Sequence, residues 1–261
     1  MAAHILVMRR LSLLLILLAL PARAAPVDVT YSLAAFGITV LDITARIDVS
    51  DRGYRVEARS QTTGAAALFA RGAQTTLAEG QWRGPDAVPL RYRADGVWRG
   101  EQRRTHLDFE ANRPLLRTLV PAMEPEREAV PESGLAGTLD TLSALMWMAR
   151  SAGMQGRCDG RRMTFDGRRL QEWTMRTEGR QEIVAVGGSY RAPALRCAIT
   201  TQLIAGFRSD ESREVTGRVI PGTVWLGLVS PHLPPIPVRV DLETRMFGTI
   251  RVDLNRVTTP P

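Results

Sequence analysis

Apolar and polar residues alternate with a period of two along much of this chain. Between Val27 and Leu33, and again between Leu41 and Val49, every second residue is apolar and the residues between are Asp, Thr, Ser or Arg. A β-strand with this pattern buries one face and leaves the other in water. The pattern returns in residues 54–60, 90–94, 238–242 and 250–254. It predicts a large antiparallel sheet with one apolar and one charged face.

Turn signals separate several of these runs. Asp95-Gly96, Asp166-Gly167 and Gly187-Gly188 are each flanked by strand-like residues, and such pairs favour hairpins because both positions accept positive φ. Short turns between antiparallel strands imply a meander. By count of the apolar runs, the sheet should hold ten or more strands and curve into an open β-barrel.

The middle of the chain departs from this pattern. Residues 112–137 are rich in proline and charge, which is typical of a crossover over one continuous sheet or of a linker between two domains. We expect one domain over residues 25–261, because neither strand-rich half has its own helix to cover it.

One helix is expected at about residues 138–152, with Thr138 or Asp140 as its N-cap and Gly153 as its end. Its apolar residues at helical spacing include Leu139, Leu142, Leu145 and Met146. A helix of about four turns covers only a few strands. These residues therefore either fill a packed barrel or line a hydrophobic groove for an acyl chain or a lipidated partner.

The first 24 residues have the order of a secretory signal peptide. Arg9 and Arg10 precede the apolar run Leu11–Leu20, and Ala22-Arg23-Ala24 follows. This run of ten residues is too short to span a bilayer, which needs about 20 apolar residues. We expect cleavage before Ala25 and a periplasmic protein, exported by the general rather than the twin-arginine route, with Met1 or Met8 as the start.

Cys158 and Cys197 are the two cysteines of the chain. In an oxidising compartment an even count predicts one disulfide, worth roughly 3–4 kcal/mol for a loop of this length. The exported chain would hold two histidines, His106 and His232, so we expect no metal and no cofactor.

All 34 basic residues are arginine. Loss of Arg9, Arg10 and Arg23 with the signal peptide lowers the formal net charge from +7 to +4. Such a mildly basic surface, in a compartment without nucleic acid, argues against DNA or RNA as a partner.

Several segments together resemble the bacterial envelope family called domain of unknown function 3108. They are residues 31–64, the helix segment 140–148, the segment 163–169 between the two cysteines, and residues 237–254. The resemblance implies a secreted domain with a strongly curved antiparallel sheet, similar to the open barrels of periplasmic lipoprotein carriers. It brings no catalytic residues.

Candidate catalytic residues have structural explanations. Ser189 lies in a hairpin without the G-x-S-x-G order, His106 is on the wet face of a strand, and His232 is in a proline-rich loop. Asp140 and Ser143 could present a carboxylate and a hydroxyl together, but an aspartate at a helix start favours a capping role.

A basic cluster surrounds the Asp166-Gly167 turn and could bind phosphate or carboxylate groups; it comprises Arg157, Arg161, Arg162, Arg168 and Arg169. A solvated hairpin is the alternative. We therefore expect a non-enzymatic binding or scaffold module for a lipid-like or amphipathic envelope component. An envelope hydrolase acting on glycan or ester substrates is the second hypothesis, and a structural partner that uses an exposed sheet edge is the third.

Overall fold

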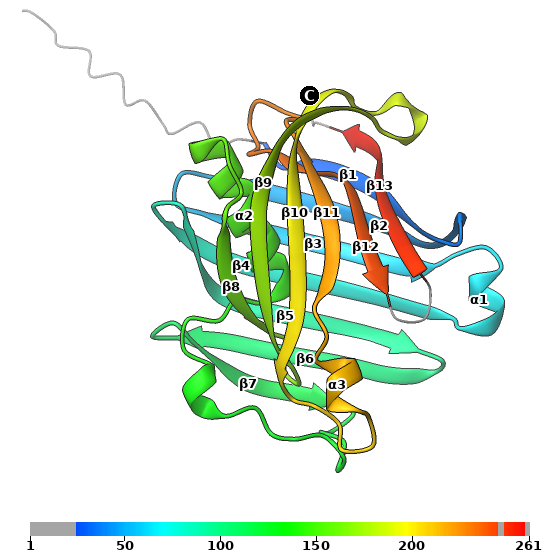
Figure 1. Cartoon of the computed structure of the whole chain (residues 1–261), viewed down its shortest axis with the longest axis vertical. Coiled ribbons are helices and arrows are strands. Elements are labelled where there is room, and N and C mark those ends of the chain that lie inside the picture. The colour runs from blue at the N-terminus through cyan, green and yellow to red at the C-terminus, as the bar shows by residue number, and fades with distance from the viewer. Residues whose placement is uncertain (1–24, 245–247, 259–261) are drawn as a thin grey trace, which may run out of the picture.

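The computed structural model describes residues 25–244 and 248–258, and the predicted signal peptide lies outside these residues. The described chain forms one 13-stranded sheet in which every pair of neighbours is antiparallel (Figure 1). The sheet curves into an open barrel with one central helix, so the predicted fold class is confirmed. None of the described helices is long and apolar enough to cross a membrane.

The first half of the chain is a meander in which consecutive strands pair. Its strands are β1 (Val27–Ala35), β2 (Ile38–Val49), β3 (Gly53–Thr62), β4 (Gly72–Arg83), β5 (Asp86–Trp98), β6 (Glu101–Glu110) and β7 (Arg113–Val120). The short helix α1 (Ala66–Phe69) lies between β3 and β4. The alternating segments predicted in this half, 27–33, 41–49, 54–60 and 90–94, each lie within one of these strands.

The second half is a further meander. It comprises β8 (Gly160–Phe165), β9 (Leu170–Val184), β10 (Arg191–Ala205), β11 (Ile220–Gly227), β12 (Ile236–Thr244) and β13 (Gly248–Thr258), with the 3-10 turns η1 (Glu132–Gly134) and η2 (Val186–Gly188) and the short helix α3 (Arg213–Thr216). The alternating segments predicted at 238–242 and 250–254 lie within β12 and β13. Strand β1 pairs with β13, as in the pairing of Tyr31 with Leu254, so the two ends of the chain join the meanders.

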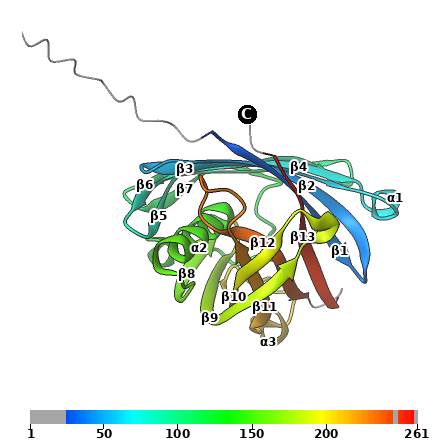
Figure 2. The same ribbon diagram turned by 90° about the horizontal axis from the view of Figure 1, so that it is seen from above.

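The strands β7 and β8 are the two edges of the sheet. Figure 2 shows β1–β7 and β8–β13 as two facing layers, with the helix α2 (Thr141–Gln155) between them at the open side. The turn between β8 and β9 reaches the other edge. A Cβ on Gly167, whose φ is +92°, would lie 2.7 Å from Cγ2 of Thr105 on β6, so this close approach requires glycine.

Two predictions of local structure were wrong. Asp95-Gly96 is not a turn but lies inside β5, where Gly96 pairs with Gln74 of β4. Glycine is needed there because a Cβ would lie 2.5 Å from the carbonyl oxygen of Ala73. The predicted crossover 112–137 begins later, because its first part is the edge strand β7, which tolerates Pro114.

The helix is displaced by about one turn from its predicted bounds. Asp140 is the N-cap, and its side chain accepts a hydrogen bond from the backbone N–H of Ser143. The helix continues through Gly153 to Gly156, which ends it in the left-handed conformation. Gly153 lies against Pro234 and Pro235, since a Cβ there would be 3.2 Å from Cδ of Pro235.

The apolar faces meet in two hydrophobic clusters. The larger one gathers residues of α2, β1–β3, β5 and β9–β13, and the smaller one includes Leu107, Phe109 and Phe165. Of the four helix residues predicted to fill a core or line a groove, Leu139 and Met146 are buried in the larger cluster. Leu142 and Leu145 are half-buried against it, and Leu142 also contacts the smaller cluster. All four residues thus pack against the hydrophobic clusters, but Leu139, predicted within the helix, lies just before α2.

Candidate functional site

An open pocket of about 1000 Å³ lies at the C-terminal end of α2. Four parts of the chain form its wall: the turn between β2 and β3 (residues 49–52), the last turn of α2 (150–156), Arg180, Pro193 and Leu195 on β9 and β10, and residues 226–235 at the end of β11 and in the following loop. We call this site the arginine pocket. Its size is in the range of small-molecule sites.

The pocket combines an apolar floor with positive charge. Leu195, Leu226 and Leu233 are buried beneath it, while Met154 and Leu228 are more than half exposed at its rim. The cationic residues Arg52, Arg150 and Arg180 come from three different elements. Within the described chain, none of these three forms an ion pair. Asp51 is the one acidic residue of the lining, so positive charge dominates.

Arg150 is held in place by aromatic side chains. Its guanidinium carbon lies 4.8 Å from the centroid of the Trp82 ring, and its Nε donates to the carbonyl oxygen of Gly84. The indole N–H of Trp82 donates to the carbonyl oxygen of Ser50 at 3.0 Å. The Trp82 ring in turn lies 4.6 Å from that of Tyr54. Arg150 is thus positioned before any ligand arrives.

The predicted disulfide is present between Cys158 and Cys197, and both residues are fully buried. It joins the segment that follows α2 to β10. Gly156 and Leu195, each two residues from one of the cysteines, line the arginine pocket. The bond therefore fixes two walls of the pocket relative to each other.

The residues Asp140 and Ser143 lie together but away from solvent. Oδ2 of Asp140 accepts from Oγ of Ser143 at 2.5 Å, and that same Oγ accepts from the hydroxyl of Tyr54 at 2.7 Å. Burial raises the pKa of Asp140 to about 6, because it outweighs the hydrogen bonds from Ser143, which lower the pKa. Neither Asp140 nor Ser143 is exposed, so this arrangement is a helix cap within the core.

The other three candidate residues occupy separate positions. Nε2 of His106 on β6 lies 3.0 Å from Asp95. The hydroxyl of Ser189, in the β9–β10 turn, donates to the carbonyl oxygen of Leu254 at 2.9 Å and so joins this turn to β13. His232 is exposed and lines the arginine pocket, which its position in a proline-rich loop did not indicate.

The predicted basic cluster is divided among several partners. Arg161 pairs with Glu172 at 3.1 Å, and Arg162 pairs with Asp86 and lies over the Trp147 ring. Arg157 donates to Gln155. Arg162 therefore links β8 to β5 through its ion pair and contacts Trp147 of α2, so its role is structural.

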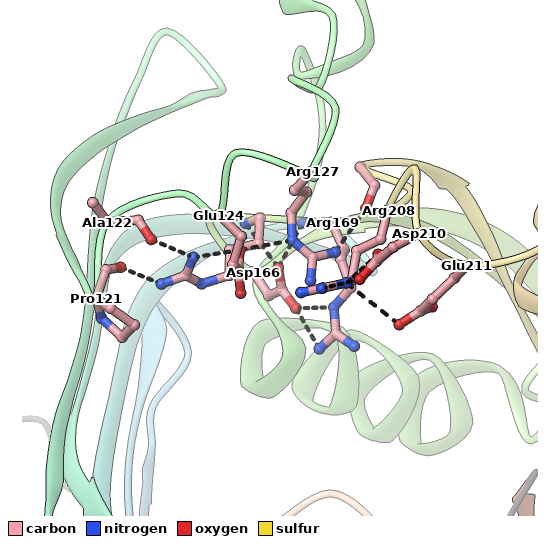
Figure 3. Close-up of polar contacts among 11 residues, drawn as sticks. Pro121, Ala122, Glu124, Arg127, Asp166, Arg169, Arg208, Asp210 and Glu211 are labelled. Carbon is pink, nitrogen blue, oxygen red and sulfur yellow. Dashed lines mark hydrogen bonds and ion pairs between the residues drawn. The ribbon is translucent and has the colours of Figure 1, made fainter.

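Arg168 and Arg169 belong to a separate network at the open side of the barrel. Arg168 donates to the carbonyl oxygens of Pro121 and Ala122 and pairs with Glu124, while Arg169 pairs with Asp166 at 2.8 Å. Arg127 also pairs with Glu124 at 3.0 Å (Figure 3). Partial burial raises the pKa of Glu124, but the hydrogen bond from Arg127 and the charge of Arg168 outweigh this effect and lower the pKa to about 2. The network joins the end of β7 to the β8–β9 turn.

No group of three or more His, Cys, Asp or Glu side chains in the described ranges could hold a metal ion. The arginine pocket itself was not foreseen from the sequence. Arg52, Arg150 and Arg180 are far apart in the chain and share no motif. The proline-rich segment 231–235 was visible as a loop, but only the fold places it beside the end of α2.

Comparisons with known proteins agree with the fold. The crystal structure of a β-barrel-like protein of domain of unknown function DUF1849 from Brucella abortus has a TM-score of 0.59 and 14% sequence identity, and the alignment covers 91% of this chain and 99% of that one. No curated protein matches the sequence. The model of the family "Protein of unknown function (DUF3108)" matches residues 27–255, which include nearly the whole barrel. The chain therefore belongs to the DUF3108 family.

Proposed function

We propose that this protein is a non-enzymatic binding module of the periplasm that holds an amphipathic ligand with an anionic head group in the arginine pocket. The observation that carries the proposal is the combination of unpaired arginines with an apolar floor. Arg52 and Arg180 are exposed and free to pair with a carboxylate or phosphate. Met154 and Leu228, which are more than half exposed above the buried leucines of the floor, offer apolar surface to a hydrocarbon chain.

The hydrolase hypothesis has less support. The hydroxyl of Ser143 is hydrogen-bonded to the buried carboxylate of Asp140, which makes it the candidate nucleophile. A nucleophile, however, must reach its substrate. Ser143 is fully buried and already occupied by Tyr54 and Asp140. His232 lines the arginine pocket, but among the described residues no nucleophilic side chain is hydrogen-bonded to its ring. A binding function therefore explains the arginines and the apolar residues of the pocket better than a catalytic function does.

The test is binding of a fluorescent fatty acid and of its uncharged alcohol analogue. We expect the acid to bind at least about tenfold more tightly than the alcohol, because a charge-assisted hydrogen bond contributes about 1.5–3 kcal/mol. The variant Arg52→Gln/Arg180→Gln should remove this preference. Arg157→Gln/Arg161→Gln, outside the pocket, is the matched control and should keep it.

Two results would contradict the proposal. One is equal affinity of the wild type for acid and alcohol, and the other is equal binding by the two double variants. Native mass spectrometry of the protein from its own host gives an independent check. A co-purified anionic lipid mass supports a carrier, and a stable complex with another protein in its place supports a scaffold.

A further inference from the structure

The two most exposed large apolar side chains of the described residues lie at the end of the barrel opposite the arginine pocket. Leu68 and Phe69 of α1 are 84% and 83% exposed. Ile38, at the start of β2, is 60% exposed, and Trp98, at the end of β5, is 41% exposed. We call these four residues the apolar tip. Figure 1 shows α1 projecting beyond the neighbouring strands, and Figure 2 shows the same projection from above.

The tip and the arginine pocket are at opposite ends of one hairpin. Strand β2 begins at Ile38 in the tip and ends at Val49 in the pocket lining. Strand β3 returns from the pocket to the loop that carries α1. The two features therefore use different residues and can be tested independently.

The tip is held at its base by hydrogen bonds. The backbone N–H of Thr63 donates to the carbonyl oxygen of Val40 at 3.1 Å, and that of Arg99 donates to the carbonyl oxygen of Arg71 at 2.9 Å. A Cβ on Gly72 would lie 2.3 Å from the Trp98 ring, so the ring packs directly on this glycine. The fold thus presents Leu68 and Phe69 outward on an anchored loop in which no residue of α1 is buried.

The loops of the tip carry positive charge, and the nearest acid, Glu101 opposite Trp98, forms an ion pair with Arg103 at 3.5 Å. The described residues 36–38, 63–72 and 97–100 contain Arg71 and Arg99 and neither Asp nor Glu. In the described part of the chain, neither arginine forms an ion pair. Apolar and aromatic side chains next to arginine match the boundary between anionic lipid head groups and acyl chains.

We infer that the apolar tip is a docking site for an anionic lipid membrane surface, with Leu68 and Phe69 entering the acyl region and Arg71 and Arg99 contacting phosphate groups. A second copy of the chain fits less well, because two tips in contact would bring their arginines together. A convex tip of so few residues would also bury less than the roughly 1,000 Å² expected of a stable protein interface. A lipid surface needs no complementary cavity.

Sedimentation with lipid vesicles tests this inference. The chain from Ala25 onward, which holds every described strand and helix, is mixed with vesicles of phosphatidylcholine alone or with added phosphatidylglycerol. We expect the wild type to bind the phosphatidylglycerol vesicles, and Leu68→Ser/Phe69→Ser to weaken this binding by at least about tenfold. Arg71→Gln/Arg99→Gln should remove the dependence on phosphatidylglycerol and on salt.

The control variant Val215→Ser/Val219→Ser removes two other exposed apolar side chains and should bind as the wild type does. Because all of these side chains are exposed, thermal unfolding should be nearly unchanged in every variant. The pocket variant Arg52→Gln/Arg180→Gln should also bind vesicles normally, which separates this inference from the proposed function.

Three outcomes would overturn the inference. They are no vesicle binding by the wild type, equal binding by the wild type and Leu68→Ser/Phe69→Ser, and a lipid-free dimer that this variant alone dissociates. The last would assign the tip to self-association.

Discussion

The hydroxyl of Tyr54 donates a hydrogen bond to Oγ of Ser143 at 2.7 Å and thereby joins β3 to α2 across 89 residues of sequence. Both side chains are buried, and the Ser143 hydroxyl in turn donates a hydrogen bond to Oδ2 of Asp140. The central helix is therefore attached to the sheet by polar contacts as well as by apolar packing. Satisfied buried networks of this kind favour one arrangement of the core.

Substitutions should show that Tyr54 and Ser143 act together. We expect Tyr54→Phe to lower the free energy of unfolding by about 1–2 kcal/mol, and Ser143→Ala by about 2–3 kcal/mol because it leaves the Tyr54 hydroxyl and Oδ2 of Asp140 without their shared partner. Urea unfolding of the two single variants and the double variant gives their coupling. Strictly additive losses would show that the hydrogen bond contributes nothing of its own.

Asp140 should make stability depend on pH between about 4 and 6. Burial raises its pKa from 3.8 to about 6, so the folded state holds this proton more tightly than the unfolded state. The resulting stabilisation, about 3 kcal/mol at about 1.4 kcal/mol per pKa unit, is fully present below pH 4 and is lost as pH rises through 6.

Asp140→Asn should remove this loss, because the amide does not ionise. Urea unfolding of both proteins at a series of pH values measures the difference between them. A constant difference from pH 4 to pH 7 would contradict the raised pKa. Glu124, with a pKa lowered to about 2, acts with the opposite sign, since its contribution is lost as pH falls below about 4.5.

Replacement of both cysteines should destabilise the fold. The bond between Cys158 and Cys197 closes a loop with a sequence separation of 39, so Cys158→Ser/Cys197→Ser should lower the free energy of unfolding by about 3–4 kcal/mol. Urea unfolding under non-reducing conditions measures this loss. In the native protein, two thiols that react with an alkylating reagent would contradict the bond.

Leu142 tests how well the helix packs. Because it contacts both hydrophobic clusters, Leu142→Ala should cost about 2–4 kcal/mol. Leu68→Ala, at a highly exposed position, is the control and should change stability by less than about 0.5 kcal/mol. A loss below about 1 kcal/mol for Leu142→Ala would indicate open space around the helix rather than a packed core.

The signal peptide remains a prediction from the sequence. We expect N-terminal sequencing of the protein from its host to begin at Ala25, in the periplasmic fraction. A protein that retains Leu11–Leu20 and sediments with membranes would contradict both cleavage and the proposed location.

The sequence was sufficient for the elements whose signal is local. In the segment 41–49 apolar and polar residues alternate because successive side chains of a strand point to opposite faces. The structure has the strand β2 at this segment. The cap at Asp140 also needs only neighbouring backbone groups. Local signals failed where glycine serves a distant neighbour, as at Gly96 against β4 and at Gly153 against Pro235, since the same residue is also typical of turns and helix ends.

The sites depended on tertiary structure. Five arginines close in sequence have different partners in the fold, such as Glu172 on the neighbouring strand for Arg161 and Glu124 in the loop after β7 for Arg168. Arg52, Arg150 and Arg180 meet in one pocket because a turn, a helix end and a strand converge there. The sequence thus determined the strands, the cap and the cysteine pair, which depend on local periodicity and composition. Long-range packing decided which charges remain free, because that depends on which segments the barrel brings together.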